Sequence, residues 1–226
     1  MSVLLVIATV IAVGELLSWL ADSIEWGGET LPPPNINDIL QANYRPEECD
    51  EKMRLQCQQI LQDYFKEPID APLYQRIDEG MRGMDVEQKK RLLRDITIKA
   101  SEVMNVELDN IIFADETCMG YYSAADNTIV FSNLYIAQDV CNVEIVKTVF
   151  HELKHAVQFK AIGRDGNVWG YSMGTLVAWA NNYQDYISSS WDPEGYITQP
   201  IEVDSFGFEC SVIPQPGLSS PNVNVA

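Results

Sequence analysis

Apolar residues recur at helical spacing along residues 143–162. Asn142 suits the N-cap of such a helix, and Gly163 suits its C-terminal end. The lysines of the segment mark a more polar side of the helix: Lys147, Lys154 and Lys160. We therefore predict one amphipathic helix of ordinary length. It is not a membrane span, because a span needs roughly 20 mostly apolar residues.

Four other segments show the same helical periodicity. They are a helix that starts after Pro46 and carries its apolar stripe to Phe65, and helices at residues 86–104, 175–187 and 203–213. Residues 163–174 are rich in glycine and are expected to form a loop. Residues 188–200, which contain Pro193 and Gly195, are expected to form a connection without regular structure.

Patterns typical of strands follow residue 105. Short apolar runs fill Asn110–Ala114, Gly120–Ser123 and Thr128–Ser132. The last two runs flank the turn-forming residues 125–127, so together they predict a β-hairpin. The order of helix, strand, hairpin and helix indicates an α+β fold.

An almost unbroken apolar run fills residues 3–21, interrupted by Gly14 and Glu15. The run suits a secretory signal or a membrane anchor, although no Lys or Arg precedes it. It equally suits a buried or partner-binding helix of a soluble protein. Membrane association through these residues stays open, and so does localisation: membrane-anchored, secreted or cytoplasmic.

The chain has 15 Lys and Arg against 33 Asp and Glu, which gives a formal net charge of -18. This charge repels phosphate backbones, so nucleic acid is not expected as a partner. The five cysteines form no C-x-x-C pair and leave one thiol over in any complete disulfide scheme. We expect them to be reduced thiols of the core.

The two histidines of the chain, His151 and His155, lie four residues apart in the first predicted helix, with Glu152 directly after His151. Residues four apart share one face of a helix, so both imidazoles can bind a single metal ion. Glu152 then projects beside the metal and can act as general base toward a zinc-activated water. The alternative is a solvated helix face with an incidental pair of histidines.

A catalytic zinc ion needs a third protein ligand and a free position for water. Because no other histidine exists, this ligand must be Asp, Glu or Cys. Glu202 is the predicted ligand, since Pro200 and Ile201 would direct the first turn of the last helix inward. Asp204 is predicted to accept a hydrogen bond from the outer nitrogen of a ligating histidine, and Glu209 is the alternative ligand. Otherwise these acids only favour a helix N-terminus through its dipole.

With this pattern the chain resembles the gluzincin metallopeptidases, which combine the two histidines of H-E-x-x-H with a downstream glutamate, and especially their compact, minigluzincin-like forms. The resemblance covers residues 86–213 and is specific at the H-E-x-x-H residues. Further downstream the chain departs from the gluzincin pattern. Gluzincins commonly place the ligand glutamate four residues before an Asp or Asn, whereas Glu202 lies two residues before Asp204.

The resemblance implies a zincin-like fold. In such a fold a small mixed or antiparallel sheet packs on a backing helix, here residues 86–104, and on the H-E-x-x-H helix, with additional helices N-terminal to them. It also implies that the hairpin strand near Thr128–Ser132 forms the edge of the cleft and pairs with an extended peptide.

Motif and resemblance together imply a zinc-dependent metallopeptidase with Zn2+ as cofactor and a peptide or protein as substrate. Glu152 would take a proton from water and pass it to the leaving amine. Tyr183, Tyr186 or Tyr196 would stabilise the oxyanion, unless these side chains are core aromatics. Hydrolysis also requires that water can reach the metal between the two imidazoles.

Two other functions remain compatible with the sequence. One is a regulatory or protein-interaction protein of zincin fold with restricted or no proteolytic activity. The other is a membrane-tethered binding protein in which the motif is incidental.

The chain is accordingly expected to have five parts. These are an apolar N-terminal helix at residues 1–25, a proline-rich linker at 26–35, a helical region at 36–105, a zincin-like catalytic domain at 106–213 whose backing helix is 86–104, and a disordered tail at 214–226.

Overall fold

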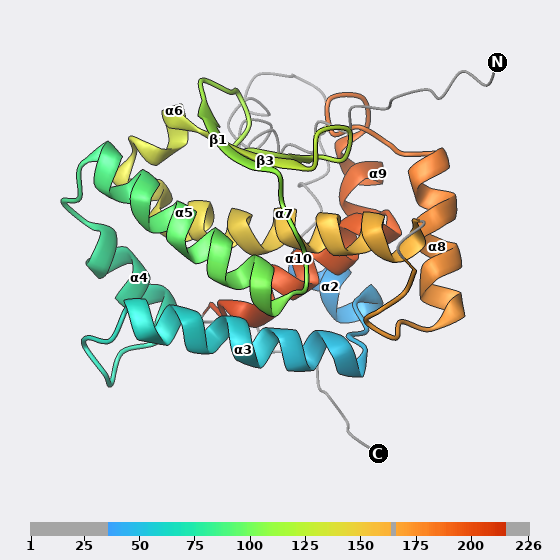
Figure 1. Ribbon diagram of the computed structural model, residues 1–226, viewed down its shortest axis with the longest axis horizontal. Coiled ribbons are helices and arrows are strands. Elements are labelled where there is room, and N and C mark those ends of the chain that lie inside the picture. Colours follow the sequence, from blue (N-terminus) through green and yellow to red (C-terminus); the bar gives the residue numbers. More distant parts are fainter. Residues whose placement is uncertain (1–35, 164–165, 216–226) are drawn as a thin grey trace, which may run out of the picture.

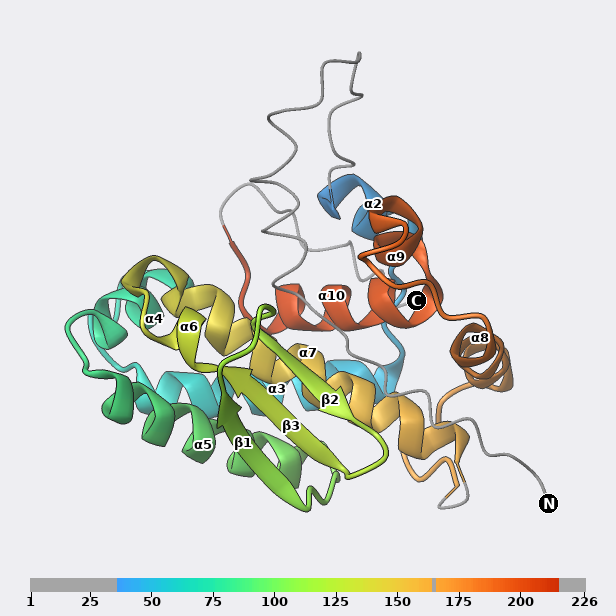
Figure 2. The same cartoon turned by 90° about the horizontal axis from the view of Figure 1, so that it is seen from above.

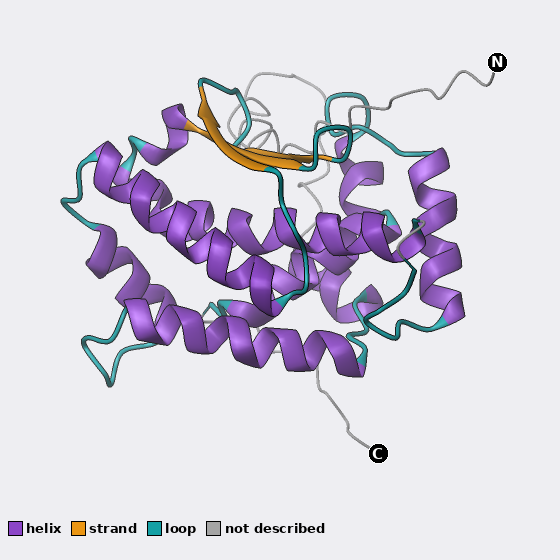
Figure 3. Ribbon diagram, in the orientation of Figure 1, coloured by secondary structure: helices purple, strands orange, loops and turns teal. Residues whose placement is uncertain are grey.

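The computed structural model describes residues 36–163 and 166–215. These residues form an α+β fold, as predicted, in which helices outnumber strands (Figures 1 and 3). In chain order the elements are α2 (Ile36–Asn43), α3 (Glu48–Tyr64), α4 (Leu73–Met81), α5 (Val86–Val103), β1 (Asn110–Ala114), β2 (Gly120–Ser123), β3 (Thr128–Ser132), α6 (Asn133–Ile136), the 3-10 turn η1 (Asp139–Cys141), α7 (Asn142–Ile162), α8 (Met173–Gln184), α9 (Pro193–Thr198) and α10 (Pro200–Val212).

A small mixed sheet covers α5 and α7 from one side (Figure 1). Its strand order is β1-β3-β2, with β1 parallel and β2 antiparallel to β3. α3 lies on the opposite side of α5 and α7, and α10 runs along α7 on the side away from α5 (Figure 2). The helix that carries both histidines is therefore enclosed by the sheet and by other helices, of which α10, α5, α8 and α4 contact it directly.

Local signals explain where the main helices begin. Asp85 caps α5, since its side chain accepts from the backbone N–H of Gln88 at 2.8 Å and the Gln88 side chain accepts from the Asp85 N–H at 2.9 Å. α10 begins at Pro200, three residues earlier than predicted, because proline suits the first helical position. The predicted helices over 46–65, 86–104, 143–162 and 175–187 are confirmed to within a few residues.

The prediction that three lysines mark a polar side of α7 is wrong for two of them. Lys154 is completely buried and Lys147 almost so, and only Lys160 remains partly exposed. The reason is the position of α7, which packs on all sides. Residues from the surrounding elements fill the core around it: Leu61, Leu93, Ile96, Phe131 and Phe208.

The predicted hairpin is confirmed, but the expected role of its second strand is wrong. β3 pairs with β2 on one side, and β1 occupies its other side over the full length of the strand. A central strand has no free backbone groups with which to pair an incoming peptide. The sheet edge closest to α7 is instead β2.

Several helices were not predicted, among them α2, α4 and α9, and α9 occupies part of the expected connection at 188–200. The apolar run at 3–21, the linker and the tail from residue 216 onward lie outside the described residues. Among the helices that are described, none has the length and apolar character needed to cross a membrane. All five cysteines lie within the described part, and none of them forms a disulfide bond.

Candidate metal centre

Three side chains converge between α7 and α10. The Nε2 atoms of His151 and His155, from successive turns of α7, lie 3.0 Å apart. Glu202, in the first turn of α10, places Oε2 at 3.3 Å from His151 Nε2 and Oε1 at 3.5 Å from His155 Nε2. In the part of the chain that the structure describes, these three residues are the group whose donor atoms come close enough to hold one metal ion.

The spacing of these donors fits a zinc ion. Ligands about 2.0 to 2.2 Å from a tetrahedral zinc lie about 3.3 to 3.6 Å from one another, and the three observed separations of 3.0, 3.3 and 3.5 Å are close to this range. Glu202 Oε2 is buried and has no hydrogen-bond partner among the described residues. A buried acceptor of this kind is costly unless a cation or donor satisfies it, so the residues present fit the expected metal.

The start of α10 holds Glu202 in place. The backbone N–H of Ile201 donates to Asn182 Oδ1 of α8 at 3.0 Å, and the Asn182 amide donates to Gln199 Oε1 at 2.7 Å. α8 therefore satisfies the free N-terminus of α10, and the predicted role of Pro200 in turning this helix inward agrees with its place at the first helical position.

The outer nitrogens of the two rings have different partners. His151 Nδ1 lies 3.2 Å from Glu209 Oε2, whereas His155 Nδ1 lies 2.9 Å from Gln158 Oε1 and 3.3 Å from Ser205 Oγ. Glu209, the alternative ligand, therefore lies behind the His151 ring rather than beside Glu202. Sequence spacing contained a signal for Gln158 that the prediction missed, since it lies three residues after His155 on the same helix face.

The predicted contact between Asp204 and a ligating histidine is wrong. Asp204 Oδ2 accepts instead from the Gln158 amide at 2.7 Å and from Lys154 Nζ at 3.1 Å. Lys154 also donates to Asp50 of α3 and to the Tyr171 hydroxyl at 2.8 Å. Burial alone would lower the pKa of Lys154, but Asp204 and Asp50 raise it above its ordinary value. Asp204 thus belongs to a buried ion-pair network next to the candidate centre.

Glu152 lies in the same buried region, and neither of its carboxylate oxygens has a hydrogen-bond partner among the described residues. Burial, with a smaller contribution from the charge of Glu202, raises the pKa of Glu152 to about 8 against the opposing charge of His151. A carboxyl group with these properties can hold and release a proton near neutral pH.

The electrostatics of the centre favour a positive charge. Burial alone would lower the pKa of His151, but Glu202 and Glu209 raise it to about 10. Burial would likewise raise the pKa of Glu202, yet the two imidazoles lower it to about 2. The buried carboxylates therefore need a cation between them, either a proton on His151 or a metal ion.

The three tyrosines proposed to stabilise an oxyanion differ in their contacts. Tyr186 donates to Glu202 Oε1 at 3.0 Å, and Tyr183 donates to the carbonyl oxygen of His155 at 3.4 Å. The hydroxyl of Tyr196 is buried close to Glu202 and Tyr186, and it forms no well-aligned hydrogen bond within the described ranges. Tyr186 thus supports the candidate ligand, and the hydroxyl left to bind another group is that of Tyr196.

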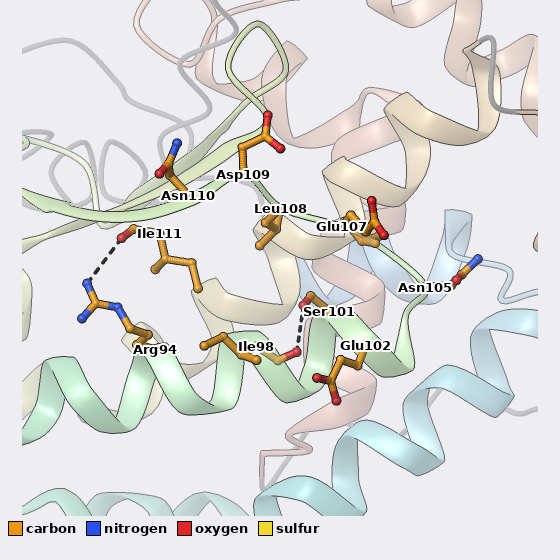
Figure 4. A pocket seen from close by; sticks show the side chains of 11 residues that line it. Arg94, Ile98, Ser101, Glu102, Asn105, Glu107, Leu108, Asp109, Asn110 and Ile111 are labelled. Carbon is orange, nitrogen blue, oxygen red and sulfur yellow. Dashed lines mark hydrogen bonds between the residues drawn. The ribbon is translucent and has the colours of Figure 1, made fainter.

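The centre is closed. The side chains of His151, Glu152, His155 and Glu202 have no solvent-exposed surface, so water or a peptide can reach them only if the surrounding elements move. A pocket of about 750 Å³ lies elsewhere, between α5 and the segment that leads into β1 (Figure 4). Its lining side chains include Arg94, Glu102 and Asn105, and none of the candidate ligands.

Comparison with known proteins identifies no relative of this chain. No family model, no curated protein and no solved structure matches this chain. Its function is therefore inferred from the geometry and chemistry of the centre between α7 and α10.

Proposed function

We propose that this protein is a zinc-dependent metallopeptidase of zincin-like fold, with Zn2+ bound by His151, His155 and Glu202. The main support is the convergence of three buried donors at the spacing of zinc ligands, beside the buried and unpartnered carboxylate of Glu152. The proposed substrate is a peptide or protein.

Each residue has a defined part in the proposed reaction. Bound zinc would supply a Lewis acid that polarises a carbonyl group and makes water acidic near neutral pH. Glu152 would hold the proton on a carboxylate oxygen and transfer it to the leaving amine nitrogen, a task that its raised pKa suits. The hydroxyl of Tyr196 would donate to the oxyanion that forms at the scissile carbonyl.

The arrangement of elements supports the same proposal. α5 would be the backing helix under the sheet, α7 the metal-binding helix, and α10 the helix that supplies the glutamate ligand. β2, in place of β3, would be the strand that pairs with an extended peptide, because it is the sheet edge next to α7.

Complete burial of the centre favours a second candidate function. Structural zinc sites are closed, whereas catalytic sites keep a position open for water. A regulatory or protein-interaction protein with zincin-like fold and a structural zinc would need no access to His151 and His155. A peptidase requires the elements around these residues to open when substrate binds.

The Glu152→Gln variant distinguishes the two functions. The full chain and this variant are loaded with zinc, their metal content is measured, and hydrolysis of a fluorogenic peptide library and of unfolded proteins is followed. A peptidase keeps equal zinc in both forms and loses about 10²- to 10⁴-fold of its activity on substitution. Stoichiometric zinc without hydrolysis in either form would support the structural function, and absence of zinc from the wild type would show that the motif is incidental.

A further inference from the structure

Gln158 connects the two helices that carry the candidate zinc ligands. It is fully buried on α7, one turn after His155. Its Oε1 atom lies 2.9 Å from His155 Nδ1, and its Nε2 atom donates to the Ile201 carbonyl oxygen at 3.0 Å and to Asp204 Oδ2 at 2.7 Å. Both ends of the amide are therefore in use.

The partners of the amide determine its orientation. The Ile201 carbonyl oxygen and the Asp204 carboxylate both accept hydrogen bonds, so the NH₂ group of Gln158 must face them. Oε1 then faces His155, and the nitrogen that donates to it has to be Nδ1–H. In the neutral imidazole this leaves the lone pair on Nε2, which is the atom directed toward His151 and Glu202.

The same amide also holds the start of α10. Ile201 directly precedes Glu202, so the bond from Gln158 to the Ile201 carbonyl sets the distance between the second imidazole and the carboxylate ligand. A glutamate at this position could accept from His155, but it could not donate to the Ile201 carbonyl and would oppose the charge of Asp204. Glutamine meets both requirements at once.

Asp204, which accepts from the Gln158 amide, is itself held by buried charges. Asp204 accepts from Lys154, which also contacts Asp50 of α3 and lies over the rings of Tyr171 and Phe208. Asp204 is therefore fixed from the side opposite to Gln158, and the amide has little freedom to turn.

We propose that Gln158 is a positioning residue of the metal centre, which fixes His155 in the form protonated at Nδ1 and sets the separation between His155 and Glu202. This inference rests on the proposed zinc binding and deepens it. It adds Gln158 to the three residues of the motif, His151, Glu152 and His155. The residue does not contact the metal donors of α10 themselves, so its effect is on geometry and affinity.

The test uses Gln158→Leu and a matched control, Gln58→Leu. The Gln58 amide also ties a helix to α10, since it donates to the carbonyl oxygens of Ser211 and Val212 at 3.0 and 3.1 Å, but it does so at the end of α10 away from Glu202. Zinc affinity of the full chain is measured by competition with a chelator. Gln158→Leu should weaken zinc binding about 10- to 100-fold, and Gln58→Leu should leave it unchanged.

A second measurement gives a result on the wild type as well as on the variant. The chain has two histidines, so ¹⁵N-labelled histidine gives an NMR spectrum with two imidazoles. In the zinc-loaded wild type, His155 should carry its proton on Nδ1, protected from exchange, and Gln158→Leu should shift this resonance and expose the proton to solvent. If Gln158→Leu does not fold, a wild-type His155 coordinated through Nδ1 would still overturn the proposal.

The two proposals fail in different ways. A wild type that binds zinc, with unchanged affinity and an unchanged His155 spectrum in folded Gln158→Leu, would overturn the role of Gln158 and leave the metal site standing. A wild type that takes up no zinc would overturn the proposed function and the role of Gln158 with it.

Discussion

Two glutamates of α10 have distinct positions around His151, which separates their expected roles. Glu202 faces the inner nitrogens of both rings and Glu209 faces the outer nitrogen of one. Glu202→Ala should therefore abolish stoichiometric zinc binding, whereas Glu209→Gln should weaken it about 10- to 100-fold. Chelator competition on both variants measures this order, and full zinc in Glu202→Ala with loss of zinc in Glu209→Gln would reverse the assignment.

Zinc uptake should release protons. His151 has a pKa raised to about 10 in the metal-free protein, so it carries a proton at neutral pH that a metal ligand cannot keep. We expect release of about one proton or more per zinc at pH 7, and an affinity that falls as the pH is lowered. Titration calorimetry in buffers of different ionisation enthalpy counts these protons, and binding without proton release would contradict the assignment of His151.

Helical spacing explains which residues of the centre the sequence could predict. His151, Glu152 and His155 follow from the motif, and the structure brings Glu202 to the two histidines. The prediction for Asp204 fails because the residues that share a helix face with Glu202 lie three and seven positions further on, at Ser205 and Glu209. These two side chains are the ones next to the imidazole rings of His155 and His151. Asp204, two positions on, points toward Lys154 instead.

Among the helix contacts, α10 packs closely on the residue that follows α2 at one glycine. A methyl group at Gly207 would overlap the ring of Tyr44. Gly207→Ala should therefore destabilise the protein, because overpacking costs about 1 to 3 kcal/mol and exceeds the gain in helix propensity of about 1 kcal/mol. Gly174→Ala on α8 is the control, since its nearest neighbour is Ser172 Oγ at 3.8 Å. Urea denaturation measures the free energy of unfolding of both variants, and equal losses in the two would contradict this packing.

The buried Lys154 should be important for holding α3, α7 and α10 together. Lys154→Met leaves Asp50 and Asp204 buried without their cation, a change that typically costs about 3 to 5 kcal/mol. Lys160→Met makes the same replacement at a partly exposed position of α7 and should change stability by less than about 0.5 kcal/mol. The free energy of unfolding of the metal-free variants tests this, and similar values for both would show that the ion pair contributes little.

The main helices and all three strands were predictable because each has its own periodicity or capping signal, as Asp85 and Gln88 show at the start of α5. Short elements such as α4 and α9 lack enough turns to display a period. The position of β3 in the centre of the sheet was not predictable either, since the alternation of side chains within a strand does not reveal which distant strand will pair with it.

The α+β class of the molecule can be predicted from the order of the expected elements. The burial of α7 cannot be predicted in this way. Lysines on a helix usually indicate a solvated face, and here Lys154 is enclosed because acids from α3 and α10 arrive from far along the chain. The same enclosure closes the candidate metal centre. Whether the protein hydrolyses peptides thus depends on opening of the elements packed on α7, which the Glu152→Gln comparison tests.

We propose that two imidazoles and a carboxylate of this chain hold one zinc ion. X-ray absorption at the zinc edge of the purified, zinc-loaded full chain tests it most directly, because the five cysteines offer sulfur ligands as a clear alternative. We expect one zinc per chain with about two imidazole nitrogens and otherwise oxygen neighbours at about 2.0 to 2.2 Å, and loss of this signal in His155→Ala. Sulfur neighbours at about 2.3 Å, or an unchanged spectrum in His155→Ala, would contradict it.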